Sequence, residues 1–129
     1  MKKILFVCVH NAGRSQMAEA FFNHFAKGKA IAVSAGTQPE PSLSVNSVKV
    51  MREAGIELNG HEPKLLTLEM LEDADRVITM GCYVEDACPS SSVATEDWAL
   101  GNPKGQPLEE VRIIRDRIKA KVQGLINEL

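Results

Sequence analysis

The chain has 129 residues, 44% of them hydrophobic and 25% charged, which is the composition of one globular domain with an ordinary core. Its formal net charge of −2 and its pI near 5.9 give no general attraction to nucleic acid or to an anionic membrane. Its apolar runs are far shorter than the roughly 20 residues of a membrane span, and three cysteines do not suit a secreted disulfide framework. We therefore expect a single cytoplasmic domain over residues 1–129, with neither nucleic acid nor membrane as a partner.

The first predicted element is a strand, because the run Ile4–Val7 is apolar and rich in residues that favour β-structure. It passes through a tight loop into a helix predicted over Arg14–Ala26, whose apolar side chains recur at spacings of three and four. A strand and a helix joined in this way aim backbone N–H groups and the positive end of the helix dipole at one point, which attracts an anion. The candidate anion-binding residues are those of the loop: His10, Asn11, Ala12, Gly13, Arg14 and Ser15.

Cys8 opens this loop and Arg14 closes it. A thiol reacts as the thiolate, which a helix N-terminus and a nearby cation both favour, and the Ser15 hydroxyl can donate a further hydrogen bond to the sulfur. Arg14 offers a planar fork that grips two oxygens of a tetrahedral oxyanion. The alternative is that Cys8 is a small hydrophobic residue at the end of a buried strand, as free cysteines often are. The Arg-Ser pair and the immediate helix favour a nucleophile aimed at the central atom of a bound oxyanion.

The rest of the chain continues the alternation of strands and helices. Further strands are predicted at Ala30–Ala35, at Arg76–Met80 and near Val93–Thr95. Further helices are predicted over Val45–Ala54 with Ser44 as N-cap and Gly55 as stop, after Thr67 as a short capped helix, and from Pro107 onward. Leu68 and Leu71 should form the buried face of the short helix. The last helix should bury apolar residues at helical spacing: Leu108, Val111, Ile114, Ile118, Val122 and Leu125.

This alternation implies an α/β fold, with three α/β/α layers around a flavodoxin-like, four-stranded parallel sheet in the order 2-1-3-4. Ligands bind such sheets beyond the carboxyl ends of the strands, where the strand order reverses. Here that point lies between Cys8, which ends the first strand, and Gly81, which follows the third. Neighbouring strands are about 4.8 Å apart. Cys82 should therefore emerge close to Cys8, and a modest loop movement brings the two thiols within disulfide range.

The other two cysteines, Cys82 and Cys88, fall in a polar, serine-rich segment between the third and fourth predicted strands. Three interpretations compete: a redox pair on a mobile loop, two inert structural thiols, or zinc ligands. Structural zinc sites favour closer cysteine spacing and four protein ligands, whereas the histidines of this chain are scattered. A polar loop suits a thiol that must meet a partner better than it suits a buried structural cysteine, which favours the redox pair.

Three segments together resemble a known family: the loop from Cys8 to Ser15, the segment Val33–Gly36, and the segment Val77–Cys82 followed by Cys88-Pro89. They resemble the thioredoxin-coupled arsenate reductases, which share the low-molecular-weight protein tyrosine phosphatase fold, and the match covers nearly the whole chain. The resemblance implies that arsenate is the substrate and that thioredoxin is the reductant. We expect no cofactor, no bound metal and a monomer.

The resemblance also implies a role for each thiol. Cys8 attacks arsenate while Arg14 clamps the oxyanion. Cys82 then attacks Cys8, arsenite leaves, and a Cys8–Cys82 disulfide forms. Cys88 next attacks Cys82 and releases Cys8, and the resulting Cys82–Cys88 disulfide is presented to thioredoxin.

The chain departs from its relatives where many of them carry an Asp-Pro pair whose Asp is a general acid, because the matching pair here is Asn102-Pro103. An amide cannot protonate a leaving group, which disfavours phosphatase chemistry. It also leaves the reductase without an assigned acid, for which Asp97 and a proton of the substrate are the candidates. Asn102 can equally be a turn residue before proline.

A second departure concerns the potassium site that some relatives have near the catalytic loop. Asn11 and Ser34 match part of it, but Lys64 falls where a carboxylate is expected, so we do not expect the site here. Two rival functions stay open: a low-molecular-weight phosphatase, and a non-catalytic thiol protein that binds arsenite or a soft metal ion. Glutaredoxin or a mycothiol-type reductant could also replace thioredoxin.

Overall fold

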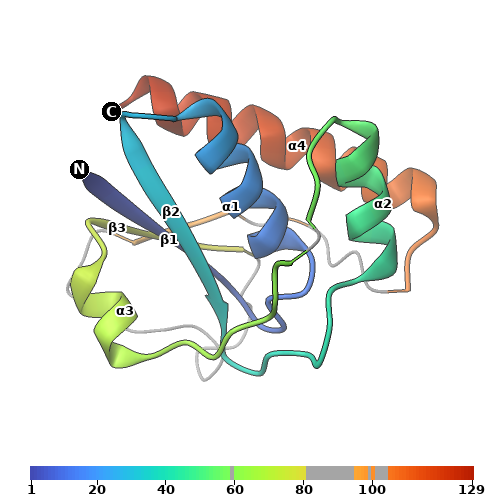
Figure 1. Ribbon diagram of the computed structural model, residues 1–129, viewed down its shortest axis with the longest axis horizontal. Coiled ribbons are helices and arrows are strands. Elements are labelled where there is room, and N and C mark those ends of the chain that lie inside the picture. Colours follow the sequence, from blue (N-terminus) through green and yellow to red (C-terminus); the bar gives the residue numbers. More distant parts are fainter. Residues whose placement is uncertain (59, 81–94, 99, 101–104) are drawn as a thin grey trace.

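The computed structural model describes residues 1–58, 60–80, 95–98, 100 and 105–129 (Figure 1). Its elements follow the predicted order: β1 Lys2–Cys8, α1 Arg14–Phe25, β2 Ala30–Gly36, α2 Val45–Glu53, α3 Leu68–Asp73, β3 Arg76–Thr79, β4 Thr95–Asp97 and α4 Leu108–Asn127. β4 extends to Asp97, beyond the predicted end of the fourth strand, and Val93 lies outside the described residues. No helix in these ranges is long and apolar enough to cross a membrane.

The four strands form a parallel sheet in the order β2-β1-β3-β4, as predicted (Figure 1). β1 lies between β2 and β3, and its register pairs Cys8 with Gly36 and Val7 with Thr79. The carboxyl ends of parallel strands meet at the same edge of the sheet, and the strand order reverses at β1. Cys8 therefore stands at the switch point where proteins of this architecture bind their ligands.

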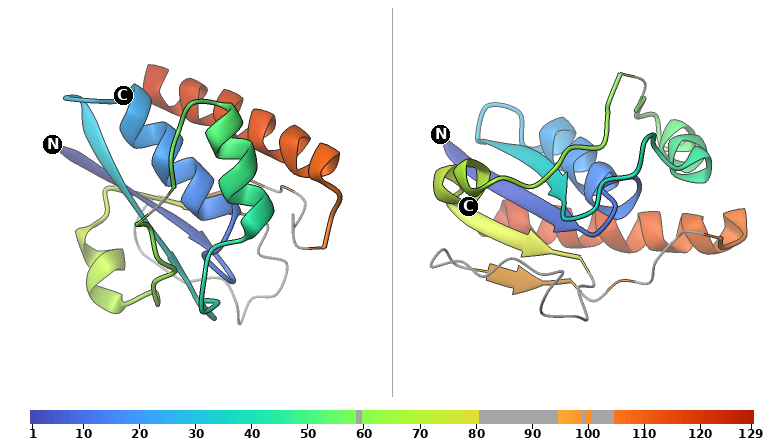
Figure 2. Two further views of the ribbon diagram at one scale, coloured as in Figure 1. Left: turned by 45° about the vertical axis from the view of Figure 1, so that its right-hand side comes forward. Right: turned by 90° about the horizontal axis from the view of Figure 1, so that it is seen from below.

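Side chains of β1 alternate between the two faces of the sheet. Ile4, Phe6 and Cys8 belong to the larger core, which also contains apolar residues of α1, α2 and α4. Leu5 and Val7 belong to a smaller core on the side of α3. Figure 2 shows α1, α2 and α4 over one face of the sheet and α3 near the other. The predicted three-layer α/β/α architecture is thus confirmed.

The helices begin at the predicted capping residues. Ser44 Oγ accepts a hydrogen bond from the Ser47 N–H at 3.4 Å at the start of α2, and Thr67 Oγ1 accepts one from the Met70 N–H at 3.2 Å at the start of α3. α4 begins directly after Pro107. Its predicted core residues are buried, except that Leu108 is only partly buried: Val111, Ile114, Ile118, Val122 and Leu125.

The buried face predicted for the short helix is wrong at Leu68, which is 70% exposed. Leu71 packs against the smaller core as predicted, and Met70 packs there in place of Leu68. α3 has only six residues, and Leu68 is its first residue after the Thr67 cap. A helix of fewer than two turns presents too few residues for apolar spacing to decide which side faces the sheet.

Candidate active site

The loop between β1 and α1 folds back closely over the end of β2. Asn11 has a φ of 49°, in the left-handed region that asparagine tolerates better than most residues. Gly36 lies directly against the turn, because a Cβ atom at this position would stand 2.6 Å from the carbonyl oxygen of Val9. A close approach that only glycine permits therefore sets the shape of the loop.

The sulfur of Cys8 is buried and has two hydrogen-bonding partners in the loop. The Asn11 backbone N–H donates to Sγ at 3.2 Å, and the Ser15 hydroxyl lies 2.8 Å from Sγ. Asn11 Oδ1 accepts from the Lys64 backbone N–H at 2.8 Å, so Asn11 Nδ2 is the group that donates to Ser15 Oγ at 2.7 Å. The Asn11 N–H and the Ser15 hydroxyl are thus the two hydrogen-bonding partners of the sulfur within the loop.

Asn11 and Ser15 support the loop from behind. Both are fully buried, and the described residues that line the neighbouring pocket include neither. Gln16 completes the support, because its Nε2 donates to Asn11 Oδ1 and to the carbonyl oxygen of Glu62, both at 3.0 Å. The sequence analysis missed Gln16 and the segment 62–64, since these contacts join positions 46 and 53 residues apart. The side chains of Asn11 and Ser15 therefore shape the loop from behind the pocket.

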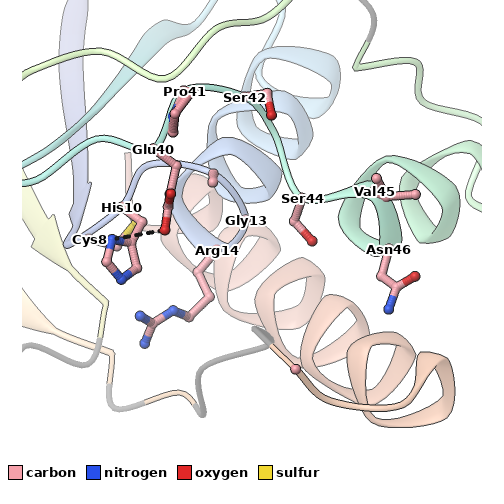
Figure 3. A pocket seen from close by; sticks show the side chains of 12 residues that line it. Cys8, His10, Gly13, Arg14, Glu40, Pro41, Ser42, Ser44, Val45 and Asn46 are labelled. Carbon is pink, nitrogen blue, oxygen red and sulfur yellow. Dashed lines mark ion pairs between the residues drawn. The ribbon is translucent and has the colours of Figure 1, made fainter.

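A pocket of about 320 Å³ opens beside the loop (Figure 3). It is lined by five of the predicted site residues: Cys8, His10, Ala12, Gly13 and Arg14. Arg14 is buried, and its Nη1 donates to the carbonyl oxygen of Leu100 at 3.1 Å. A guanidinium carries five N–H donors in a fixed plane, so this bond orients the group while others can bind an oxyanion. The structure thus brings the predicted nucleophile and the predicted clamp to one cavity.

The opposite wall of the pocket comes from the segment between β2 and α2 and from the start of α2. The sequence analysis did not assign these residues to the site: Glu40, Pro41, Ser42, Ser44, Val45 and Asn46. Backbone hydrogen bonds fasten this wall to the loop, from Gln38 N to Val9 O at 2.8 Å and from Ser44 N to Ala12 O at 2.8 Å. Such pairing between two irregular segments leaves no periodic pattern in the sequence.

His10 and Glu40 meet where the loop and this wall join. The Nδ1 atom of His10 lies 3.7 Å from Glu40 Oε1 and 3.2 Å from the carbonyl oxygen of Gln38 (Figure 3). The Glu40 backbone N–H also donates to the carbonyl oxygen of His10 at 3.0 Å. The pair is therefore held by both backbone and side-chain contacts, at the edge of the cavity that contains Cys8.

Behind the loop, the buried carboxylate of Glu19 on α1 has two basic neighbours. His61 Nδ1 lies 3.3 Å from Oε2, and Lys64 Nζ lies 3.8 Å from Oε1. Asn11 Oδ1 already accepts two hydrogen bonds. A potassium ion beside Glu19 would face the Lys64 ammonium, so these residues do not fit that ion. Within the part of the chain that the structure describes, no three His, Cys, Asp or Glu side chains gather as a metal site requires.

Asp97, a candidate acid in the sequence analysis, lies on β4 with its carboxylate bonded to β3. Its Oδ1 accepts a hydrogen bond from the Thr79 hydroxyl at 2.6 Å across the β3–β4 pair. The described residues that line the cavity do not include it. The strand position of Asp97 explains this, because its side chain is turned toward the neighbouring strand instead of the Cys8 loop.

The predicted positions Cys82, Cys88 and Asn102-Pro103 lie outside the described residues. The last described residue before Cys82 is Met80, whose N–H donates to the carbonyl oxygen of Val7 at 2.9 Å. The end of β3 thus lies beside the strand that carries Cys8, as the predicted strand order requires.

Comparisons with known proteins agree with this geometry. Residues 3–129 match the family described as low molecular weight phosphotyrosine protein phosphatase. The chain is 38% identical over 131 residues to a Halobacterium salinarum protein with the provisional name arsenate reductase. The match covers 98% of this chain and 92% of that protein. It is 35% identical over 133 residues to the glutaredoxin arsenate reductase of a Synechocystis strain, and the match covers 100% of this chain and 99% of that protein.

Solved structures show the same fold. A thioredoxin-dependent arsenate reductase of Corynebacterium glutamicum superposes with a TM-score of 0.85 at 32% identity, over 99% of this chain but only 61% of that longer chain. An arsenate reductase solved in its phosphate-binding state gives a TM-score of 0.86 at 35% identity, over 99% and 98% of the two chains. On the family match and these relatives, the chain belongs to the low molecular weight phosphotyrosine protein phosphatase family.

Proposed function

We propose that this chain reduces arsenate to arsenite. The observation that carries the proposal is the pocket in which the Cys8 sulfur, with two hydrogen-bonding partners, lies beside the oriented guanidinium of Arg14. A pocket of this kind suits a tetrahedral oxyanion attacked at its central atom. The names of the relatives as arsenate reductases support arsenate as that oxyanion. The proposal treats residues 1–129 as one cytoplasmic, monomeric domain without a cofactor.

The first step joins Cys8 to the substrate. The Cys8 thiolate attacks the arsenic atom of HAsO₄²⁻, an S–As bond forms, and one As–O bond breaks. The leaving oxygen takes up a proton and departs as water, so the product is Cys8–S–AsO₃²⁻. Arg14 and the loop backbone hold the remaining oxygens and stabilise their charge through the reaction.

The next steps supply two electrons from thiols. The Cys82 thiolate attacks Cys8 Sγ, an S–S bond forms, and the S–As bond breaks with its electron pair on arsenic, which leaves as arsenite. The Cys88 thiolate then attacks Cys82 Sγ and releases the Cys8 thiolate. Support for this order comes from the pairing of β1 with β3, since Cys82 follows Met80 by two residues in the sequence.

The reductant of the Cys82–Cys88 disulfide is proposed to be thioredoxin. The name of the Corynebacterium relative supports this choice, while the name of the Synechocystis relative gives glutaredoxin as the alternative. Arsenate-dependent NADPH oxidation, measured once with thioredoxin and thioredoxin reductase and once with glutathione, glutaredoxin and glutathione reductase, separates the two. No arsenite from a single turnover of the fully reduced protein, which needs no external reductant, would refute the proposed function.

A phosphatase is the rival enzyme, because the family includes phosphatases by its description. With Asn102 in place of an acid, we expect slow hydrolysis of p-nitrophenyl phosphate by the wild type and faster hydrolysis by Asn102→Asp. Fast wild-type hydrolysis together with no arsenate turnover would favour the phosphatase. Arsenite bound without any turnover would favour the thiol-binding alternative.

A further inference from the structure

We propose that His10 donates the proton that the leaving oxygen of arsenate requires, and that Glu40 holds His10 in position for this transfer. The inference rests on the proposed function and assigns its missing acid. It arises from a pair of titratable side chains, His10 and Glu40, which line the same cavity as Cys8 and Arg14 but which the mechanism above does not use.

An acid is needed because the As–O bond breaks most readily when the departing oxygen leaves as water. Arg14 is a poor source of that proton, since a guanidinium stays protonated in proteins. Asp97 is directed to Thr79 and is absent from the described lining of the pocket. Among the described residues that line the cavity, His10 and Glu40 are the titratable side chains besides Cys8 and Arg14.

The hydrogen bonds of His10 define which ring nitrogen faces the substrate. A carbonyl oxygen only accepts, so the Nδ1 atom that lies 3.2 Å from Gln38 O carries a hydrogen. The proton that can be transferred is therefore the one on Nε2. His10 lines the same cavity as Cys8 and Arg14, and Figure 3 shows its imidazole in front of Cys8 in that view. A proton on Nε2 in this position can pass to an oxygen of an anion held by the loop.

Negative charge lies around His10 when substrate is bound. Glu40 Oε1 lies 3.7 Å from Nδ1, and the Cys8 thiolate and the oxyanion add negative charge, while Arg14 opposes them. The side chains of His10 and Glu40 are 32% and 31% exposed, so solvent can restore the proton after each transfer. Backbone bonds from Gln38 to Val9 and from Glu40 to His10 keep the two side chains in register.

The test compares wild type, His10→Gln, Glu40→Gln and a control, His24→Gln, in a single turnover with arsenate, following the loss of free thiols. His24 is the matched control because it lies exposed on α1, stacked edge-on against Phe25 and outside the pocket. We expect His10→Gln to lower the single-turnover rate by about 100-fold, within the range of general acid catalysis. Glu40→Gln should lower it a few-fold, as expected for a partly exposed ion pair, and His24→Gln should leave it unchanged.

Two further readouts separate proton donation from a merely structural or electrostatic role. The wild-type rate should fall at alkaline pH as the donor loses its proton, and His10→Gln should lack that fall. Inorganic phosphate, titrated by calorimetry, should bind His10→Gln within a few-fold of wild type. A loss of phosphate affinity equal to the loss of rate would overturn the inference, because His10 would then act only as a charge.

The result also separates this inference from the function on which it rests. A normal rate in His10→Gln, with normal arsenate-dependent thiol loss in the wild type, would overturn the role of His10 and leave the reductase proposal intact. Thiols that stay reduced in the wild type would overturn both.

Discussion

The two walls of the pocket are built in different ways. The Cys8 loop is buried except at Val9 and His10, and side-chain hydrogen bonds from Asn11, Ser15 and Gln16 fix it from behind. The opposite wall, around Glu40 and Val45, is more exposed and is held chiefly by backbone hydrogen bonds. The buried side-chain hydrogen bonds of the loop hold the Cys8 sulfur in one geometry. The opposite wall is held by its backbone, so its side chains can be replaced without loss of those backbone hydrogen bonds. Substitutions in the loop should therefore have large effects, and those in the wall should have smaller ones.

The largest effect is expected at the loop, from Arg14→Lys. Lysine keeps the positive charge but loses the planar fork that grips two oxygens, and it cannot reproduce the oriented bond to Leu100. We expect arsenate turnover to fall about 100-fold, comparable to the removal of one oxyanion donor. Steady-state kinetics measure this, and a change of less than threefold would show that Arg14 acts only as a point charge.

Gly36→Ala should produce the next largest effect by forcing the loop away from β2. The added Cβ atom would stand 2.6 Å from Val9 O, so the backbone must shift at a cost of about 2 kcal/mol or more in stability. Urea denaturation measures the change. Gly124→Ala is the matched control: a Cβ atom there meets nothing within 4 Å, and alanine should slightly stabilise α4. Equal stability of the two variants would contradict the close approach.

Asn11→Ala tests the support behind the sulfur. It removes the acceptor of the Lys64 and Gln16 N–H groups, and leaving buried donors unpaired costs about 2 kcal/mol. Cys8 should also react more slowly with iodoacetamide, because Ser15 loses the amide that orients its hydroxyl. The control is Asn46→Ala in the opposite wall, whose amide makes only a long 3.5 Å contact with Gln106 O. A similar loss of stability in both variants would remove the contrast between the walls.

The architecture and the centre of the site were predictable from the sequence, because both depend on local patterns. The apolar run of β1 and the tight loop from Cys8 to Arg14 are patterns that lie within a few residues of sequence. Glu40 was not predictable, since its contacts with His10 join two irregular segments that are 30 residues apart in the sequence. Leu68 was predicted as buried, but a helix of six residues offers too short a pattern to orient.

The smallest effect is expected far from the pocket, at Glu53 on the surface between α2 and α4. The hydrogen bond from Arg112, helped by Arg115, lowers the pKa of Glu53 below its usual value. A lowered folded-state pKa gives stability that is present above the pKa of the unfolded state and is lost as the pH falls through the folded value. Glu53→Gln should therefore be slightly less stable than wild type at neutral pH, and the difference should vanish in acid. Thermal unfolding of both proteins from neutral to acid pH measures this difference in stability. A difference that grows as the pH falls would contradict the lowered pKa of Glu53.

The central claim is that Cys8 attacks the oxyanion and that two electrons then pass through Cys82 and Cys88. The most direct measurement is peptide mapping by mass spectrometry after a single arsenate turnover, with arsenite counted in the same sample. We expect one arsenite for each Cys82–Cys88 disulfide in the wild type, a trapped Cys8–Cys82 disulfide in Cys88→Ser, and no arsenite from Cys8→Ser. A wild-type product that bridges Cys8 to Cys82, or arsenite released by Cys8→Ser, would contradict this claim.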